Sequence, residues 1–585
     1  MEQETRFIIT MVLVLVIAVV LFQFTRPSVQ QPQQTQRPSQ GRAAQQPQRA
    51  EKPPPSPPQP PPGVEVSGPT GGRVRDKDGA MLVDWKRRFG ALTSVSLAHT
   101  DTDGRYLYPA PGEREKPLTL FTAAEALAPL TMFAGEKPVV GIWSAETDGR
   151  SVTFTGPIDE GLRCTKVFRV SPTEKFRCDV EVTLENVAKH PRAVRDVWIV
   201  LSSTVGRESG RSGYCGAVYA VRSGEGFDLE DLGPGDVEEA KPEVFEKHFT
   251  FAGLQNKYFA AIAAPLEGDW KVNALKVRRL AGAQMPGGAD EEKVVPLAVL
   301  ARFADEVIPP GGKVSAGFLV YWGPKDPDAL SHYSDRGFDG LVSYGIFGIL
   351  SRIFLAIMQG VYWLLPNWGV AIIVLTLIVR AALHPVSRKQ QVALMRYQAK
   401  VREIQPELEK LKKKYRGDRR RLNEETLKLF RKNKVPLIPA GGCLLMILQI
   451  PVFIGLYQAL NRSILLRQSS FLWIADLASP DRLFKMPFSL PVLGPYFNLL
   501  PILTLVVMIA QQKLQAAVAP AAQQQGKFMT YFMYIFLSVV FYALPSGLVL
   551  YFLISTSVGL LEARLVRGYM RRAHPELVAS PTQET

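Results

Sequence analysis

The sequence predicts a membrane α-helical bundle, made of a five-helix core and an N-terminal anchor helix, with a large β-sandwich domain and a cytoplasmic helical hairpin. Three observations lead to this fold class. Long apolar runs occur at the N-terminus and again after residue 340. Between them, short runs alternate with the two-residue period of strands. A strongly basic block interrupts the second apolar region, so the average of 46% hydrophobic and 21% charged residues hides a sharp partition.

Residues 1–26 predict a transmembrane signal anchor. Within them, residues 7–24 carry no charge, and the run is just long enough to cross a hydrocarbon layer of roughly 30 Å. No small-x-small cleavage site follows, which argues against a cleaved signal peptide. Residues 27–73 are rich in Pro and Gln and cannot bury a core, so they predict a semi-rigid linker.

Residues 74–335 predict the β-sandwich domain. Runs such as 151–155 and 178–184 alternate or are continuously apolar, and turn residues separate them. We find no catalytic constellation and no metal-ligand spacing, so a docking or scaffold role is expected, and a surface for sugars or peptides stays open. Cys164, Cys178 and Cys215 permit at most one internal disulfide, and we expect small apolar residues.

The core is expected over residues 340–570. An apolar stretch at 344–365 has polar breaks at Arg352 and Gln359 and aromatic residues at its end, which indicates an interfacial helix. Five transmembrane helices are predicted after it, at 367–385, 440–460, 490–510, 528–543 and 546–566, followed by a tail at 571–585.

The basic block at 387–434 sets the topology. It holds 17 Lys and Arg against 6 Asp and Glu, a net charge of +11, which places it in the cytoplasm. Alternation then puts the β-domain outside, in the periplasm of a bacterial inner membrane, and the C-terminus inside. Apolar residues from Val401 to Tyr415 step by three and four, and a shorter stripe follows Gly417, which predicts the helical hairpin. Its charge indicates contact with ribosomal RNA or anionic headgroups.

Arg380 is the main candidate functional residue. It lies 12 positions into its predicted span, about 18 Å of helical rise. An arginine at that depth costs at least a few kcal/mol unless it meets water or a partner. The predicted spans offer no acidic residue in their interiors, since Glu562 falls at the cytoplasmic end of the last one. The sequence therefore predicts a water-filled cavity open to the cytoplasm, lined by Arg380, Thr376 and Gln449, with snorkelling of Arg380 to the interface as the alternative.

Five motifs resemble one known family. They read NWGVAIIVLTLIVR followed by AALHP at 367–385, GGC followed by QIPVF at 441–453, FLWIADL at 471–477, PSGLVLY at 545–551, and YWGPK at 321–325. Together these segments resemble the YidC/Oxa/Alb family of membrane protein insertases, and specifically its YidC branch, which has a large periplasmic domain.

This resemblance implies an insertase and foldase that uses no cofactor and no metal and is not an enzyme. It implies that the arginine attracts polar, often acidic, segments of nascent proteins in a groove open to the cytoplasm and to lipid. The groove residues would be Arg380, Thr376 and Gln449. The apolar surface along which the substrate helix slides would comprise Ile450, Pro451, Phe453, Val540 and Tyr551.

The partners expected from the resemblance and the charge are nascent membrane proteins, the Sec translocon, the ribosome through the basic hairpin, and membrane lipids, with no small-molecule substrate. An anion transporter or channel that uses Arg380 is the competing hypothesis. It predicts internal repeats and interrupted midplane helices, which the sequence does not show. A membrane-tethered periplasmic enzyme is a third class, and it lacks catalytic residues.

Overall fold

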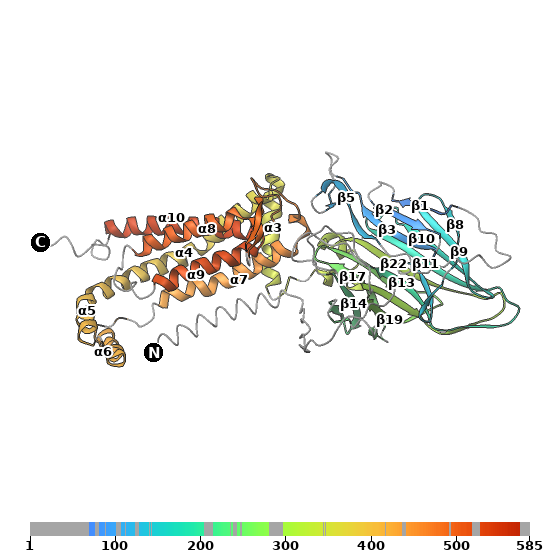
Figure 1. Cartoon of the computed structure of the whole chain (residues 1–585), viewed down its shortest axis with the longest axis horizontal. Coiled ribbons are helices and arrows are strands. Elements are labelled where there is room, and N and C mark those ends of the chain that lie inside the picture. The colour runs from blue at the N-terminus through green and yellow to red at the C-terminus, as the bar shows by residue number, and fades with distance from the viewer. Residues whose placement is uncertain are drawn as a thin grey trace, which may run out of the picture. The chain divides into compact units, whose positions relative to one another are not determined.

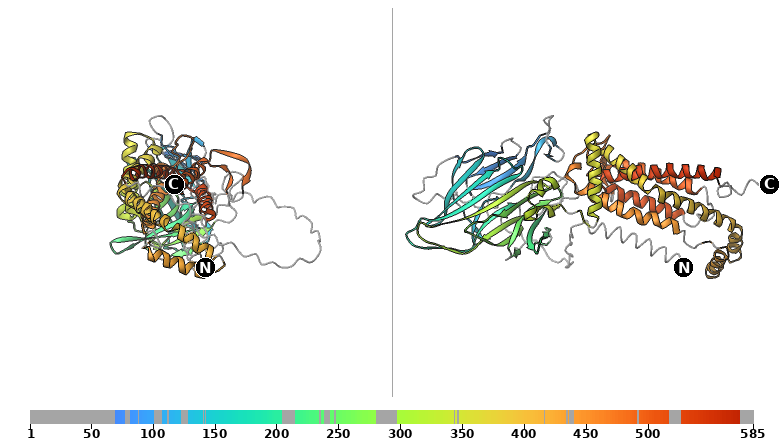
Figure 2. Two further views of the ribbon diagram at one scale, coloured as in Figure 1. Left: turned by 90° about the vertical axis from the view of Figure 1, so that its left-hand side faces the viewer. Right: turned by 180° about the vertical axis from the view of Figure 1, so that it is seen from behind.

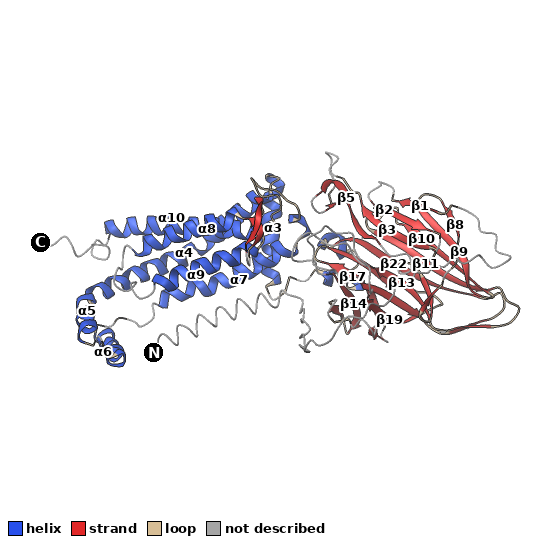
Figure 3. Ribbon diagram, in the orientation of Figure 1, coloured by secondary structure: helices blue, strands red, loops and turns tan. Residues whose placement is uncertain are grey.

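The computed structural model describes residues 69–573 with gaps at 77–80, 88, 101–106, 111–112, 123–127, 140, 142, 204–214, 234–235, 238–242, 246–247, 280–296, 343, 346, 416, 434, 436–439, 491–492 and 517–526. These residues form two compact units, a β unit up to Val342 and a helical unit beyond it (Figures 1 and 3). The predicted anchor at 1–26 and nearly all of the linker at 27–73 lie outside the described residues.

The largest sheet of the β unit has nine antiparallel strands. In spatial order they are β15 (Gly226–Leu232), β14 (Cys215–Ser223), β17 (Phe249–Asn256), β18 (Phe259–Pro265), β22 (Lys313–Pro324), β11 (Arg177–Asn186), β10 (Leu162–Val170), β9 (Ser151–Asp159) and β8 (Ser144–Thr147).

Two further antiparallel sheets and a short ribbon complete the described strands of the unit. The six-stranded sheet has the order β16 (Glu243–Phe245), β19 (Val272–Arg279), β20 (Leu297–Phe303), β13 (Val197–Ser203), β6 (Met132–Ala134) and β7 (Lys137–Pro138). The five-stranded sheet has the order β1 (Gly71–Arg75), β2 (Met81–Lys86), β3 (Ala91–Leu97), β5 (Glu113–Thr122) and β4 (Pro109–Ala110), and the ribbon pairs β12 (Arg192–Val194) with β21 (Glu306–Ile308).

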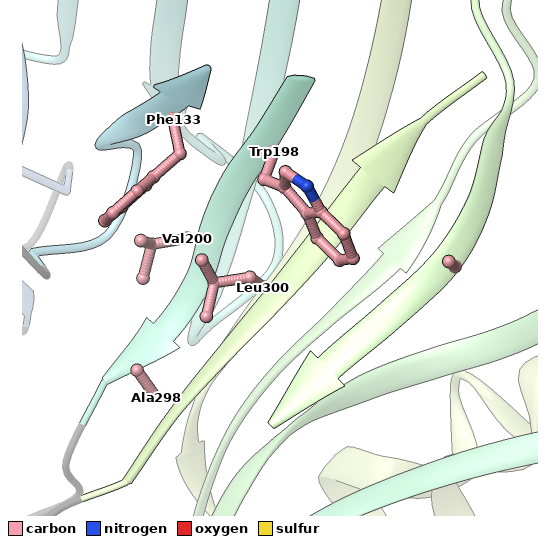
Figure 4. Close-up of a cluster of buried hydrophobic side chains, with 6 residues drawn as sticks. Phe133, Trp198, Val200, Ala298 and Leu300 are labelled. Carbon is pink, nitrogen blue, oxygen red and sulfur yellow. The ribbon is translucent and has the colours of Figure 1, made fainter. Parts of the chain in front are cut away.

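The core of the β unit lies between facing sheets. Strands β13 and β20 pack against β17, which belongs to the nine-stranded sheet. A second contribution to burial comes from a cluster of apolar side chains on β6, β13, β19 and β20. Its labelled members in Figure 4 are Phe133, Trp198, Val200, Ala298 and Leu300. Alternating burial along strands such as β10 explains why the two-residue sequence period predicted this β-rich domain.

The observed bounds of the β unit differ from the predicted 74–335 at both ends. Strand β1 begins at Gly71, and the unit continues through three short helices. One of their residues, Phe338, packs edge-on against Phe251 of β17 with ring centroids 5.1 Å apart. Because of this buried contact, the β unit extends beyond residue 335. The short helices are α2 (Pro327–Ser331), η2 (Ser334–Arg336) and η3 (Phe338–Leu341).

The three cysteines of the β unit, Cys164, Cys178 and Cys215, are buried. Burial raises the pKa of the Cys164 thiol to about 12. A thiol with so high a pKa carries almost no thiolate at neutral pH and is a poor nucleophile. The structure therefore gives these residues the character of small apolar side chains.

Lys166 is a fully buried lysine on β10. Its ammonium donates hydrogen bonds to the carbonyl oxygens of Phe89 at 3.0 Å and Leu130 at 2.9 Å. It also lies 3.8 Å from the ring centroid of Trp143. Desolvation outweighs these contacts and lowers the pKa of Lys166 to about 7.

The helical unit is a bundle with a short β-hairpin at one end and two small helices at the other (Figures 1 and 2). Helix α4 packs against α10, α7 and α3, while α8 packs against α10 and α9. The elements are α3 (Gly348–Leu364), α4 (Trp368–Glu403), α5 (Gln405–Lys414), α6 (Arg419–Lys432), α7 (Ala440–Arg462), η4 (Ile464–Leu466), β23 (Phe484–Leu490), β24 (Gly494–Phe497), α8 (Leu499–Ala516), α9 (Lys527–Ala543) and α10 (Ser546–Ala573).

Helix α4 extends far beyond the span predicted at 367–385. It begins after Asn367, whose side chain accepts a hydrogen bond from the backbone of Val370, and it runs through Pro385 to Glu403. The predicted boundary assumed that the basic block starts a new element, but charge alone does not end a helix. Among the described helices, α4 and α10 are long and apolar enough to cross a bilayer.

The basic block therefore contributes the end of α4 as well as α5 and α6. The helix breaks at Ile404, because Pro406 suits the first turn of a new helix and not the interior of an old one. Val401, Ile404, Leu429 and Val435 form a buried cluster, with Leu408 and Leu411 against it. The apolar stripes of the basic block thus pack on each other.

The span predicted at 490–510 starts too early. Strands β23 and β24 pair antiparallel, and α8 begins only at Leu499. Gly494 has a positive φ of 81°, a conformation that suits a turn and not a helix. The carboxylate of Asp481 accepts from the backbone N–H groups of Leu499 and Leu500, both at 2.8 Å, and so caps the start of α8.

The buried lysine generates a prediction about pH. Below pH 7 the folded and unfolded chains both hold the Lys166 proton, whereas between about 7 and the ordinary lysine value of 10.5 only the unfolded chain does. The free energy of unfolding of the β unit should therefore rise with pH in this window, by at most about 1.4 kcal/mol per unit. Pulse proteolysis of the full chain in urea between pH 7 and pH 9 measures this slope.

Lys166→Met should reduce that slope, while Lys189→Met, at an exposed position, should leave it unchanged. Equal slopes in the Lys166→Met variant and the unmodified protein would show that the buried ammonium does not titrate in this range.

Candidate functional site

The contact between α4 and α10 holds the main candidate residue. The face of α10 that is buried in the bundle carries small residues at Ser546, Gly547, Ser555 and Gly559. A Cβ atom added to Gly547 would lie 3.0 Å from the carbonyl oxygen of Leu477, so this glycine permits a close backbone approach.

Arg380 lies against this small-residue face. Its Nε donates a hydrogen bond to the hydroxyl of Ser555 at 2.8 Å. A Cβ atom on Gly559 would lie 3.3 Å from both terminal nitrogens of the guanidinium, so the group packs flat over that glycine. Arg380 is partly exposed, and in the described part of the chain no carboxylate lies within 4 Å of it. Arg380 thus holds a positive charge inside the bundle without a direct ion pair among the described residues.

Gln449 reaches the same face of α10 from α7. Its side-chain Nε2 donates to the hydroxyl of Tyr551 at 2.8 Å, and Tyr551 lies one turn before Ser555. The predicted groove residues Arg380 and Gln449 therefore contact successive turns of one helix. This arrangement brings together two polar groups from different parts of the sequence.

Thr376 is fully buried one turn before Arg380. Its hydroxyl donates to the carbonyl oxygen of Ile372 at 2.6 Å, within its own helix. The structure therefore places Thr376 in the packed interior beside the other two residues, and a part in lining a hydrated space stays a prediction for it.

The residues predicted to form the apolar surface along which a substrate helix slides, here called the apolar slide, divide into two groups. Ile450 is 43% exposed, and Pro451, Phe453 and Val540 are partly exposed. Tyr551 is 1% exposed and hydrogen-bonded to Gln449, so its assignment to an outer surface is wrong. A buried phenol needs a hydrogen-bond partner, and the side chain of Gln449 supplies one inside the bundle.

An aromatic cluster lies behind the slide. Phe552 of α10 packs against Phe453 of α7 and Phe541 of α9, with ring centroids 5.3 and 4.8 Å apart. Three helices therefore meet through these rings, which keeps the partly exposed residues on a defined surface.

Sequence reasoning did not identify Ser555 or Gly559, and it noted Glu562 as an acidic residue at the end of the last span without finding its partner His384. Oε1 of Glu562 lies 2.8 Å from Nδ1 of His384, where α4 and α10 continue past Arg380. The serine and glycine have the spacing of four that typifies close helix packing, which was the available signal. The pair gave no signal, because its members are far apart in the sequence.

Beyond this pair, α4 presents a basic groove of about 760 Å³. It is lined by Pro385, Arg388, Lys389, Val392, Ala393, Arg396, Tyr397 and Lys400. Four cationic side chains on one helix make this surface suitable for polyanions or acidic segments.

The loop that carries the FLWIADL motif holds the other end of the bundle. The backbone N–H groups of Ser546 and Gly547 donate to the carbonyl oxygens of Ser479 and Leu477, at 2.8 and 2.9 Å. The hydroxyl of Ser546 donates to the backbone of Asp476 at 2.8 Å. The loop therefore satisfies the first turn of α10 and fixes its position.

The site has the groups for electrostatic attraction and hydrogen bonding. Among the described residues, no group of three His, Cys, Asp or Glu side chains has the arrangement of a metal site. The guanidinium of Arg380 can attract negative charge, and the amide of Gln449 and the hydroxyls of Ser555 and Tyr551 can form hydrogen bonds.

Two family models match consecutive parts of the chain. The model described as YidC periplasmic domain matches residues 113–357, and the model described as 60Kd inner membrane protein matches residues 360–573. The first covers most of the β unit and the second covers the helical bundle with Arg380. The two matches therefore account for both units.

Curated relatives named membrane protein insertase YidC match as well. The Anaeromyxobacter dehalogenans (strain 2CP-C) protein is 34% identical over 353 residues, and that match spans 60% of this chain and 56% of the relative. The protein of Oleidesulfovibrio alaskensis is 30% identical over 76% of this chain and 78% of its own length, and that of Syntrophobacter fumaroxidans is 30% identical over 74% and 72%. With matches of this extent, the chain belongs to the YidC family of membrane protein insertases.

Proposed function

We propose that this chain inserts nascent membrane proteins into the bacterial inner membrane and helps them to fold, alone or with the Sec translocon. Family membership supports the activity. The observation that carries the mechanism is Arg380, which is held by Ser555 and has no carboxylate within 4 Å in the described part of the chain. Its charge is therefore available to a substrate.

The proposed groove lowers the cost of moving a polar segment across hydrocarbon. An unsatisfied polar group in the bilayer costs several kcal/mol, and water in a groove removes much of that penalty. A fixed positive charge adds about 2 kcal/mol of attraction for a carboxylate at roughly 8 Å, with an effective dielectric constant of 20. Such an attraction is strong enough to bias entry and weak enough to permit release.

The apolar part of the substrate leaves along the outside of the bundle. Ile450 supports this route because it is strongly exposed on α7, and the exposed Val506 and Ile535 extend apolar surface onto α8 and α9. In lipid these side chains meet acyl chains or a substrate helix equally well. The substrate helix can therefore pass from the protein to lipid without a large barrier.

The proposed orientation follows the distribution of basic residues. It places α5, α6 and the basic groove in the cytoplasm, with the C-terminus on the same side, and the β unit in the periplasm. Helix α3 fits the interface, because Ile349, Trp363 and Leu364 on it are strongly exposed.

The basic surface of α4 to α6 is the proposed contact for a ribosome and for anionic lipid headgroups. Lys412, Lys413 and Lys414 end α5, and they add to the cations of the groove on α4. Polyphosphate surfaces bind such arrays through charge and with strong salt dependence. The alternative of an anion transporter has no support from the named relatives, which are insertases.

The first test concerns the charge at position 380. Arg380→Ala and Arg380→Glu should reduce insertion of a substrate with two acidic residues in its translocated segment by roughly tenfold, the size of about 1–2 kcal/mol of lost attraction. Arg380→Lys should retain insertion, because it keeps the charge although it lacks the planar fork. Protease protection of one substrate with zero, one or two acidic residues measures the effect.

Arg352→Ala, at an exposed position on α3, is the matched control at equal protein levels. Normal insertion of the acidic substrate by Arg380→Ala would exclude attraction of the substrate by the charge at position 380. A lysine variant that inserts as poorly as the alanine variant would indicate bidentate recognition instead.

The second test concerns the cytoplasmic helices. Deletion of residues 401–432 should leave the protein in the membrane but reduce insertion, because it removes α5, α6 and most of their shared apolar cluster. Lys412, Lys413 and Lys414 changed together to Gln should weaken ribosome cosedimentation at low salt while the helices persist. Full growth of a depletion strain on the deleted protein would contradict this role.

The third test concerns the β unit. Removal of residues 71–324, with the anchor and α3 retained, should preserve insertion of a simple single-span substrate, since the groove residues all lie in the helical unit. The measurement is complementation together with insertion of that substrate. Loss of all activity in a stable truncated protein would show that the domain does more than dock or act as a scaffold.

A further inference from the structure

The His384–Glu562 pair is an unusual feature of the α4–α10 contact. The side chain of Glu562 is only 9% exposed, whereas that of His384 is 52% exposed. Oε1 of Glu562 lies 2.8 Å from Nδ1 of His384, yet it makes no hydrogen bond of good geometry within the described residues. A buried carboxylate oxygen without a hydrogen bond is costly, and a functional role for Glu562 would explain this cost.

The surrounding charge makes this carboxylate stand out. Glu562 is the single acidic residue in the sequence of α10, and α4 has just one, Glu403, at its far end. The same stretches carry many basic residues, among them Arg388 and Lys389 near His384 and Arg564 beside Glu562. Glu562 is thus a single negative charge close to a positively charged surface.

The position of the pair relates it to the proposed groove. His384 is one helical turn beyond Arg380 on α4, a rise of about 6 Å, and Glu562 is nearly one turn beyond Gly559, which the Arg380 guanidinium covers. In the proposed orientation this is the cytoplasmic side of Arg380. A segment that enters from the cytoplasm therefore meets Glu562 before it meets Arg380.

We propose that Glu562, held by His384, determines which charged segments the groove admits. This inference rests on the proposed insertase function and adds a substrate preference to it. Glu562 opposes the attraction of Arg380 for acidic residues at the groove entrance and favours basic ones. Because the two charges lie about one turn apart, each acts on a passing residue at short range and with little screening. Glu562 thus weakens the pull of Arg380 on acidic segments without abolishing it, and it eases their release.

The test uses the full chain and one substrate whose translocated segment carries two acidic, two neutral or two basic residues. Glu562→Gln keeps the size and packing of the side chain and removes its charge. We expect insertion of the acidic substrate to rise by about threefold and that of the basic substrate to fall by a similar factor, as removal of one nearby charge predicts. Glu562→Asp should keep the preference of the unmodified protein. Glu146→Gln on β8 is the control, because that carboxylate is exposed in the β unit.

Opposite shifts for acidic and basic substrates are the decisive result, since a purely structural defect would change all three in the same direction. Equal shifts, or none, would overturn the proposal.

If Glu562→Gln does not accumulate, the double variant His384→Gln with Glu562→Gln retains two amides that can pair and makes the same prediction. Arg380→Ala, measured in parallel, distinguishes failure of the Glu562 proposal from failure of the groove mechanism. If it loses acidic substrates while Glu562→Gln behaves as the unmodified protein, only this proposal fails. If Arg380→Ala also changes nothing, the groove mechanism fails as well.

Discussion

The close contact between α4 and α10 is the constraint on which the candidate site depends. Ser555 and Gly559 leave room for the guanidinium of Arg380 to lie against α10, and Ser555 accepts its one hydrogen bond to that helix. A larger residue at 559 would displace the guanidinium from this face of α10. Two small side chains thus hold a charge inside an apolar bundle without a direct ion pair among the described residues.

The two ends of the bundle differ in how firmly they are held. At the end with the β-hairpin, Asp481 caps α8, the loop around Asp476 holds the start of α10, and the ring of Phe471 lies so close to Gly369 that no other residue fits there. These hydrogen bonds and close contacts tie the loop, α8 and the start of α10 together at that end. Toward the other end, α4 and α10 contact each other through a cluster of Val392, Met395, Val566 and Met570 and through the pair of His384 and Glu562.

Much of the helical unit could be predicted because its signals are local. Apolar runs at 440–460 and 528–543 lie where α7 and α9 lie, and the Pro545 turn precedes α10. The end of α4 and the start of α8 could not be placed, since charge does not stop a helix and an apolar run is also compatible with a strand pair. For the site, the depth of Arg380 identified it from energetic cost alone. Tyr551 was misassigned because only the folded bundle reveals its bond to Gln449, and Glu562 could be paired with His384 only once α4 and α10 were known to be neighbours.

Pro385 makes α4 less stiff than a helix of its length would otherwise be. An uninterrupted helix of 36 residues is a stiff rod of about 54 Å, but proline leaves the carbonyl four residues earlier without its hydrogen bond. The rod therefore has one compliant point, immediately after His384. A load applied to α5 and α6 would therefore be expected to bend α4 at this point. The displacement would then reach the His384–Glu562 pair before it reaches Arg380, which lies nearer the end of the bundle that carries the β-hairpin.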